Sequence, residues 1–269
     1  MIDYPLNSSE LERWRLSTQS QSIEPLSIKL LEGVGVEAGK HVLDLGCGPG
    51  GLSILAAQRV GPHGSVTGVD RDPEQLSAAR KNAENAGVTN IEFVCSELND
   101  YAPPRLYDVI IGRYVLIYVQ DPDVLIEKVS KWLAANGRFG FLEMDLFKDV
   151  RSHVWPPVSN ETADAIKYIG KIMIDAGIHT YMGTRLPSIL MKYGAIGIAS
   201  DAPPQIGPRS LALPLAALKS VLPLAKKLGD PDADKYDPDV LYERETEERD
   251  ETTVTTPPLS VAAWTTPPN

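Results

Sequence analysis

Short apolar runs alternate with amphipathic stretches between residues 40 and 145. The apolar runs are rich in Val, Ile and Leu, and they predict buried strands over residues 41–46, 65–70, 91–96, 107–116 and 138–145. The stretches between them carry apolar residues at helical spacing and predict helices over residues 52–60, 73–87 and 121–137. Because strands of this kind that alternate with helices form parallel sheets, we expect an α/β fold with a doubly wound, mostly parallel sheet and helices on both faces.

The chain on either side of this region has a looser pattern. Two helices are expected before the first strand, one starting near Ser8 and a second starting at Pro25. Beyond residue 145 we expect helices over residues 161–176, 188–193 and, interrupted by Pro214 and Pro223, 211–228. The acidic stretch 229–251 is expected as a solvated helix or loop, and strands are expected over residues 196–200 and 259–264.

This pattern divides the chain into two expected parts. Residues 1–34 would form an N-terminal helical lid, and residues 35–269 would form one Rossmann-like ligand-binding domain. Within that domain, residues 145–250 would supply a cap on the carboxyl edge of the sheet, and a strand near 259–265 would complete the sheet. Two roles stay open for the N-terminal helices: packing alone, or closing over the site with Tyr4 facing it.

Composition narrows the classes of partner. The chain has 269 residues, 43% of them hydrophobic, which is ordinary for a globular protein, and a formal net charge of −10. That charge disfavours nucleic acid and anionic membrane surfaces, which need a basic face. Two cysteines make no disulfide framework, and neither a signal-peptide core nor a membrane-length apolar stretch is seen. We therefore expect a cytoplasmic protein, a monomer or homodimer, that binds small molecules and no metal.

The strongest local signal is a glycine-rich turn between the first strand and the first helix of the sheet region. The strand residues Val42–Leu45 lead into Gly46-Cys47-Gly48-Pro49-Gly50-Gly51. Glycines let the backbone come close to a ligand, and the following helix start offers free N–H groups. The next strand ends in Asp70, whose carboxylate can accept both hydroxyls of a ribose.

Two kinds of ligand fit this turn, a dinucleotide and S-adenosylmethionine (SAM). The spacing Gly46-x-Gly48-x-x-Gly51 matches the dinucleotide fingerprint, which on its own is a weak signal. The whole string VLDLGCGPG, followed by VTGVDRDPEQLSAAR, resembles the first two motifs of class I SAM-dependent methyltransferases. Dinucleotide folds do not usually place an acid, here Asp44, two residues before the first glycine. The context therefore favours SAM, while a dinucleotide site and a tight turn without ligand remain as alternatives.

The resemblance extends beyond these two motifs. Cys95-Ser96-Glu97-Leu98 is similar to the third motif of the family, where an acid accepts from the adenine amino group. In that family an acid at the place of Asp44 lies near the amino end of the methionine moiety, and a side chain at the place of Gln75 packs on the adenine. The resemblance thus implies SAM as cofactor, S-adenosylhomocysteine (SAH) as product, and a cofactor site made of Tyr4, Asp44, Gly46, Cys47, Gly48, Gly50, Asp70, Arg71, Gln75, Ser96, Glu97, Leu98, Gly112 and Arg113.

Weaker similarities cover the rest of the chain. The spacing of Glu12, Arg15 and Gln19 and the strings MGTRLP and SVLPLAKKLG resemble a bacterial branch of small-molecule methyltransferases, of the kind found in ubiquinone and menaquinone biosynthesis. The fourth strand lacks the Asn/Asp-Pro-Pro-aromatic element with which amino-methylating nucleic-acid enzymes grip a base. Arg113, at the end of that strand, has two possible roles: an ion pair with an acid such as Asp44 or Glu143, or a hold on a carboxylate of the cofactor or acceptor.

Residues beyond the cofactor motifs are candidates for the acceptor side. A sulfonium methyl transfers in line to a nucleophile, which the protein orients and, where needed, deprotonates. Glu143, Asp145 and His153 are the candidate catalytic groups, although carboxylates on a strand can equally cap a loop and a lone histidine can be merely solvated. The candidate acceptor-side residues are Trp14, Tyr118, Phe147 and Trp155, which could also only fill a core.

Three functions are consistent with these observations. The favoured one is transfer of a methyl group from SAM to a small organic acceptor. The alternatives are an enzyme that keeps SAM but does other biosynthetic work, such as a cyclase, and a dinucleotide-dependent oxidoreductase. We expect the acceptor to enter between the N-terminal helices and residues 145–205, over the ends of the fourth and fifth strands.

Overall fold

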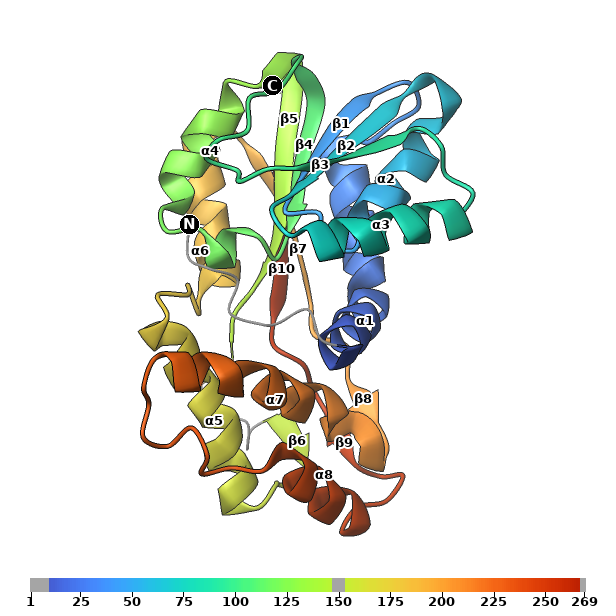
Figure 1. The fold of residues 1–269 in the computed structure, drawn as a ribbon. Coiled ribbons are helices and arrows are strands. Elements are labelled where there is room, and N and C mark those ends of the chain that lie inside the picture. Colours follow the sequence, from blue (N-terminus) through green and yellow to red (C-terminus); the bar gives the residue numbers. More distant parts are fainter. Residues whose placement is uncertain (1–9, 147–152, 267–269) are drawn as a thin grey trace.

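A seven-stranded sheet forms the centre of the computed structural model, which describes residues 10–146 and 153–266; the side chains of residues 10–21, 208 and 209 lie outside the description. The strand order is β3-β2-β1-β4-β5-β10-β7 (Figure 1). The bounds are β1 His41–Leu45, β2 Ser65–Asp70, β3 Ile91–Cys95, β4 Tyr107–Arg113, β5 Leu133–Met144, β7 Ile196–Asp201 and β10 Ser260–Thr265. Strands β1 to β5 are parallel, and β10 is antiparallel to both its neighbours. The expected α/β fold is confirmed, with a topological switch point between β1 and β4.

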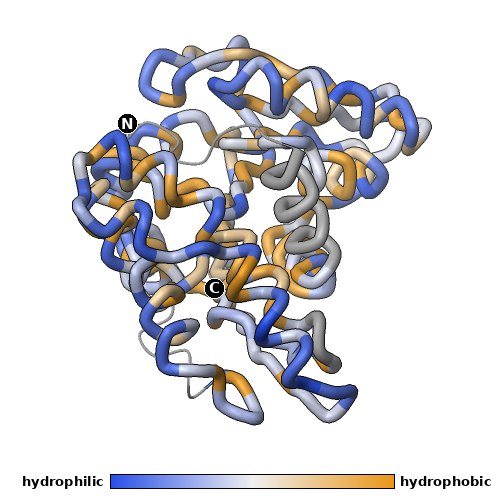
Figure 2. Tube along the Cα trace, turned by 60° about the horizontal axis from the view of Figure 1, so that its bottom comes forward, coloured by the Kyte–Doolittle hydropathy of each residue, from blue (hydrophilic) through white to orange (hydrophobic). Residues whose placement is uncertain are grey.

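Helices cover both faces of the sheet. On one face lie α1 (Glu10–Val34), α2 (Gly51–Val60) and α3 (Pro73–Asn85), and on the other lie α4 (Pro122–Ser130) and α6 (Met182–Leu190) (Figure 1). Figure 2 shows hydrophilic and hydrophobic segments alternating along the outer helices, as expected when one side of a helix packs on the core. The carboxyl ends of β1 and β4 are therefore the open edge left for a ligand.

A second group of elements lies beyond the carboxyl end of β5. It consists of α5 (Asn160–Asp175), α7 (Ala212–Lys227), α8 (Pro238–Glu247) and a small antiparallel sheet in the order β6-β9-β8 (Figure 1). The strands of that sheet are β6 Val154–Trp155, β8 Gln205–Ile206 and β9 Val254–Thr255. This group is the cap in the remainder of the article. Its elements come from residues 154–255, although α6 and β7 within that range belong to the main sheet and its covering helices, and β10 returns from the cap into the main sheet.

Several boundaries differ from the sequence expectation. The strand expected to reach Leu116 ends at Arg113, and the helix expected over residues 188–193 begins at Met182 and ends at Leu190. The two N-terminal helices are one, because α1 continues through Pro25. Leu26, Leu30 and Leu31 just beyond that proline are buried against the sheet, and their burial offsets the one backbone hydrogen bond that proline removes. The helix expected to reach Gly137 instead ends at Ser130, and β5 begins at Leu133. The role of residues 1–34 as a lid stays a prediction.

The turn after β4 is held by a buried carboxylate. Glu143, on β5 and fully buried, accepts hydrogen bonds from the backbone N–H groups of Val115, Leu116 and Ile117 at 3.0, 2.8 and 3.3 Å. These amides begin the short helix Leu116–Tyr118, which has no side-chain cap of its own. Burial raises the pKa of Glu143 to about 8, while the three amides act in the opposite direction. The carboxyl group of Glu143 therefore fixes the direction in which the chain leaves β4 at the open edge of the sheet.

The antiparallel end of the sheet depends on a slot for Trp264 of β10. A Cβ atom on Gly33 of α1 would lie 2.1 Å from the indole, and one on Gly197 of β7 would lie 2.4 Å from it. Glycine at both places lets the ring sit between helix and strand.

We expect Gly33→Ala to destabilise the fold although alanine favours helix by about 1 kcal/mol over glycine. The added methyl overlaps the indole of Trp264, and overpacking of a core costs roughly 1–3 kcal/mol. Urea unfolding measures the difference. In a Trp264→Leu background the same substitution should stabilise; a loss of equal size there would show that the indole is not the cause.

We expect Glu143→Ala to lower the free energy of unfolding by roughly 3–5 kcal/mol, because it leaves three buried N–H groups without an acceptor. Glu143→Gln, which keeps an acceptor oxygen, should cost less. The control is Asp145→Ala, which removes a carboxylate that accepts from Thr184 in an exposed place and should cost about 1 kcal/mol. Equal losses for Glu143→Ala and Asp145→Ala would contradict the assignment.

Candidate functional site

The glycine turn between β1 and α2 has a backbone that side chains would not allow. Gly46 has φ +64, and a Cβ atom on it would lie 2.5 Å from the side chain of Val115. Gly50, with φ +84, is the residue before α2 and packs closely on Ala79 of α3. The Cys47 N–H donates to the Val69 carbonyl at 3.0 Å, which ties the turn to β2. The turn thus exposes backbone at the switch point of the sheet.

Asp70 at the end of β2 anchors this turn from the side. Its carboxylate accepts from the N–H of Gly48 at 2.8 Å and from the N–H of Asp72 at 2.9 Å. Asp72 in turn caps α3 by accepting from the N–H groups of Glu74 and Gln75. Burial raises the pKa of Asp70 above its usual value. The carboxylate therefore sits beside the turn, where its remaining lone pairs can meet a ligand.

Asp44 is buried and Arg113 is half-buried behind the turn. The Ser53 hydroxyl donates to Oδ2 of Asp44 at 2.5 Å, and Arg113 donates to the hydroxyl of Ser27 on α1 at 3.1 Å. Burial raises the pKa of Asp44 to about 7, whereas the Ser53 hydrogen bond and the positive charge of Arg113 lower it. Burial also lowers the pKa of Arg113. Asp44 and Glu143 were the two partners expected for Arg113. The positive charge of Arg113 acts on Asp44, whereas Glu143 accepts its hydrogen bonds from backbone amides.

Three buried oxygen atoms around the turn lack a hydrogen-bond partner within the described part of the chain. They are Oδ1 of Asp44, Oε1 of Gln75 and Oε2 of Glu97. Since buried polar atoms are nearly always bonded, and all three are acceptors, they suit a ligand with several N–H donors. The ammonium and the adenine amino group of SAM are such donors. The residues present therefore fit the cofactor that the motifs imply.

The remaining cofactor candidates surround the same edge. Arg71 pairs with Glu97 at 3.6 Å, and the N–H of Ser96 donates to the Asp70 carbonyl at 2.9 Å. Leu98 is buried. Gly112 pairs in register with Leu45, so the end of β4 lies directly beside the glycine turn. Motif residues far apart in the sequence are thus brought together, and their individual roles toward SAM stay predictions.

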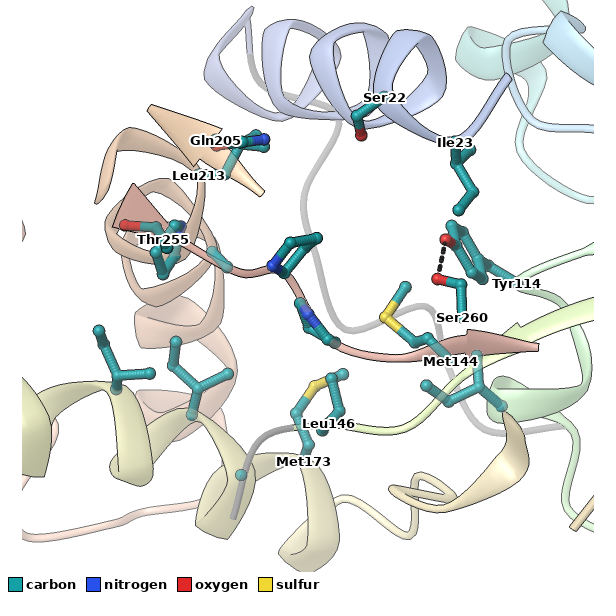
Figure 3. A pocket seen from close by; sticks show the side chains of 18 of the residues that line it. Ser22, Ile23, Tyr114, Met144, Leu146, Met173, Gln205, Leu213, Thr255 and Ser260 are labelled. Carbon is teal, nitrogen blue, oxygen red and sulfur yellow. Dashed lines mark hydrogen bonds between the residues drawn. The ribbon is translucent and has the colours of Figure 1, made fainter. Parts of the chain in front are cut away.

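A cavity of about 150 Å³ lies between α1, the ends of β4 and β5, and the cap (Figure 3). Its walls are mostly apolar, and they include Ile23, Met144, Leu146, Ile169, Met173, Leu213 and Val221. Polar groups occur at both ends, with Tyr114 and Ser260 at one end and Gln205 and Thr255 at the other (Figure 3). A wall that is apolar apart from a few polar groups is typical of a site for an organic ligand.

The acceptor-side candidates are distributed unevenly about this cavity. Tyr118 lines it. Trp155 is 69% exposed on β6, and His153, directly before β6, bonds through Nδ1 to the Thr256 hydroxyl at 3.0 Å. Asp145 accepts from Thr184 at the start of α6. Tyr4 and Phe147, and the side chain of Trp14, lie outside the described residues.

Sequence reasoning missed much of the cavity wall. Tyr114 directly follows Arg113 at a strand end, and that position was a usable signal. The far wall comes from α5, α7 and residues 255–260, which reach the cavity only through tertiary packing. Among the described residues, no group of three or more His, Cys, Asp and Glu is placed to hold a metal ion, and no helix is long and apolar enough to cross a membrane.

Comparison with known proteins finds similarity to methyltransferases. The family model described as a methyltransferase domain matches residues 36–173. The chain is 31% identical over 118 residues to the aklanonic acid methyltransferase DauC of Streptomyces sp. strain C5, which is 44% of this chain and 54% of that protein. It is also 31% identical over 172 residues to the ubiquinone biosynthesis O-methyltransferase of Neisseria meningitidis, covering 63% of this chain and 68% of the relative.

A solved structure shares the fold over nearly its whole length. The putative methyltransferase from Bacillus halodurans C-125 superposes with a TM-score of 0.56 at 14% identity, over 90% of this chain and 99% of that one. The first of the curated relatives, by contrast, is spanned over only about half its length. The matched domain, the strand order and the glycine turn with its acidic neighbours lead to one conclusion: the chain belongs to the class I SAM-dependent methyltransferase family.

Proposed function

We propose that the protein transfers the methyl group of SAM to a small organic acceptor held in the apolar cavity. The observation that carries the proposal is the juxtaposition of two features at one sheet edge. Within the described residues, buried acceptor atoms without a partner surround the glycine turn. The cavity is lined by Tyr114 and Ile117, and Val115 between them packs on Gly46 of that turn. A donor-rich cofactor and an apolar acceptor would meet there.

The residues divide between the two ligands in this proposal. Asp70 would bind the ribose hydroxyls, Glu97 the adenine amino group, and Asp44 the ammonium of the methionine end. SAM supplies an electrophilic methyl group when bound. The chain would orient the acceptor in line with that methyl group within the apolar cavity, and the acceptor would release its proton to solvent when it takes up the methyl group.

The candidate bases stay predictions within this proposal. Glu143, Asp145 and His153 each have a partner that accounts for their position: backbone amides, Thr184 and Thr256. The net charge of −10 and the two free cysteines support a small-molecule acceptor and a cytoplasmic setting. A cyclase that retains SAM remains the alternative, and mass spectrometry of the product, which detects or excludes an added methyl group, separates the two.

The first test is binding of SAH measured by calorimetry, with transfer of labelled methyl from SAM to pooled small molecules. We expect binding to wild type, and Asp70→Ala to weaken it roughly 10- to 100-fold, because hydrogen bonds to a charged group contribute about 1.5–3 kcal/mol. The matched control is Asp72→Ala, which removes the α3 cap and should lower stability by about 1 kcal/mol while SAH affinity stays. Stabilisation of the folded protein by NADH but not by SAH would contradict the proposal.

SAH affinity should also depend on pH through Asp44. Because the pKa of Asp44 is about 7, the carboxyl of the free protein is neutral at lower pH and pairs poorly with an ammonium. We expect affinity to be roughly tenfold weaker at pH 6 than at its plateau above about pH 8. The stability of the protein without ligand should change in the opposite direction. Between about pH 4 and 7 the folded chain keeps a proton on Asp44 that the unfolded chain has lost, so the free energy of unfolding should fall as pH rises through this range.

The control for this pH effect is Asp44→Asn, in which affinity should be low and flat across the same range. A wild-type affinity that does not change between pH 6 and 8 would remove the Asp44 carboxylate from the ammonium site.

A further inference from the structure

A pair of hydroxyl groups closes one end of the apolar cavity. The phenol oxygen of Tyr114 lies 2.8 Å from the hydroxyl oxygen of Ser260, and both residues line the cavity (Figure 3). Tyr114 follows β4, whereas Ser260 begins β10, 146 positions later in the chain. The pair therefore exists only because β10 returns from the cap to lie beside β5.

Tyr114 reaches the cavity through an unfavourable backbone conformation. Its φ is +56, a left-handed value that is uncommon and costly for a bulky residue. In a regular strand, Arg113 and Tyr114 would point to opposite faces. Here Arg113 bonds to Ser27 of α1, and the Tyr114 ring packs in the cluster that contains Ile23 of the same helix. The left-handed turn thus brings both side chains to the α1 face.

The surroundings maintain this conformation. The N–H of Tyr114 donates to the Leu142 carbonyl at 2.8 Å, and the next three amides are held by Glu143. Strained residues that persist under such constraint cluster at ligand sites. The strain therefore points to a function for the ring at this end of the cavity.

This end of the cavity is the one next to the cofactor turn. Val115, directly after Tyr114, packs on Gly46, and the positive charge of Arg113 acts on both Tyr114 and Asp44. The other end carries a separate bonded pair, Ser210 and Thr255, at 2.7 Å. An acceptor that fills the cavity would place its leading group at Tyr114, where a methyl group would arrive.

We propose that Tyr114, oriented by Ser260, is the residue that binds the reacting group of the acceptor, and that this group is a neutral hydroxyl on an aromatic body. The inference rests on the proposed function. A neutral hydroxyl can both donate to and accept from the hydroxyl pair, whereas an ammonium can only donate. Met144 and Met173 in the walls provide sulfur contacts that suit an aromatic ring.

The test compares 2-naphthol with 2-methylnaphthalene, in which a methyl group replaces the hydroxyl, on the SAH complex. Competition fluorescence gives both affinities, and labelled SAM reports methylation of the naphthol. We expect wild type to prefer 2-naphthol by about tenfold. Tyr114→Phe should abolish that preference while the Kd of SAH is unchanged.

Ser260 is a positioning residue in this scheme, and a double-mutant cycle separates that role from packing. Ser260→Ala should reduce the preference for 2-naphthol part of the way, and adding it to Tyr114→Phe should reduce the preference no further. The matched control is Tyr107→Phe, which removes a buried tyrosine hydroxyl bonded to Tyr101 and should leave the preference intact.

Each outcome decides a separate point. A preference retained in Tyr114→Phe would overturn the role of Tyr114. Wild type that binds SAH but neither methylates 2-naphthol nor prefers it would overturn the acceptor class. Wild type that does not bind SAH would overturn the proposed function itself.

Discussion

The carboxylate of Glu143 holds the part of the chain on which both halves of the site depend. It collects the amides of Val115, Leu116 and Ile117, so the chain leaves β4 in one direction only. One side of that turn packs on Gly46 and thereby borders the cofactor edge. The other side, through Ile117 and Tyr118, is a wall of the cavity. A single buried acid therefore holds the segment that borders both the glycine turn and the cavity.

The same edge of the sheet carries uncompensated polar groups that the fold alone would not keep. Within the part of the chain that the structure describes, Asp44, Gln75 and Glu97 each bury an acceptor atom that has no partner, and the charge of Arg113 acts on Asp44. Such groups lower stability, because each buried acceptor loses its bond to water. A ligand that donates to them recovers this free energy, so what costs stability in the free protein becomes affinity in the complex.

The sheet was predictable because its signals are local. The strands over β1, β2 and β3 begin and end within one residue of the sequence expectation, since each is a short apolar run bounded by turn residues. Asp70 and the glycine turn were found for the same reason. The continuation of α1 through Pro25 was not predictable from propensity, because burial of Leu26 and Leu30 overrides it.

The cavity was only partly predictable, and the reason is the order of the chain. The residues of its near wall directly follow β4 and β5, where polar strand ends predict a site. The far wall and Ser260 come from later in the chain and reach the cavity only through the packing of the cap and β10. His153 and Trp155 were expected on the acceptor side because of their chemistry, a role that stays a prediction; His153 bonds to Thr256, and Trp155 is exposed on β6. Chemistry at a position suggests a role, but the position of the partner decides it. Tyr114 illustrates this, because its hydroxyl partner Ser260 lies 146 positions later in the chain, on β10.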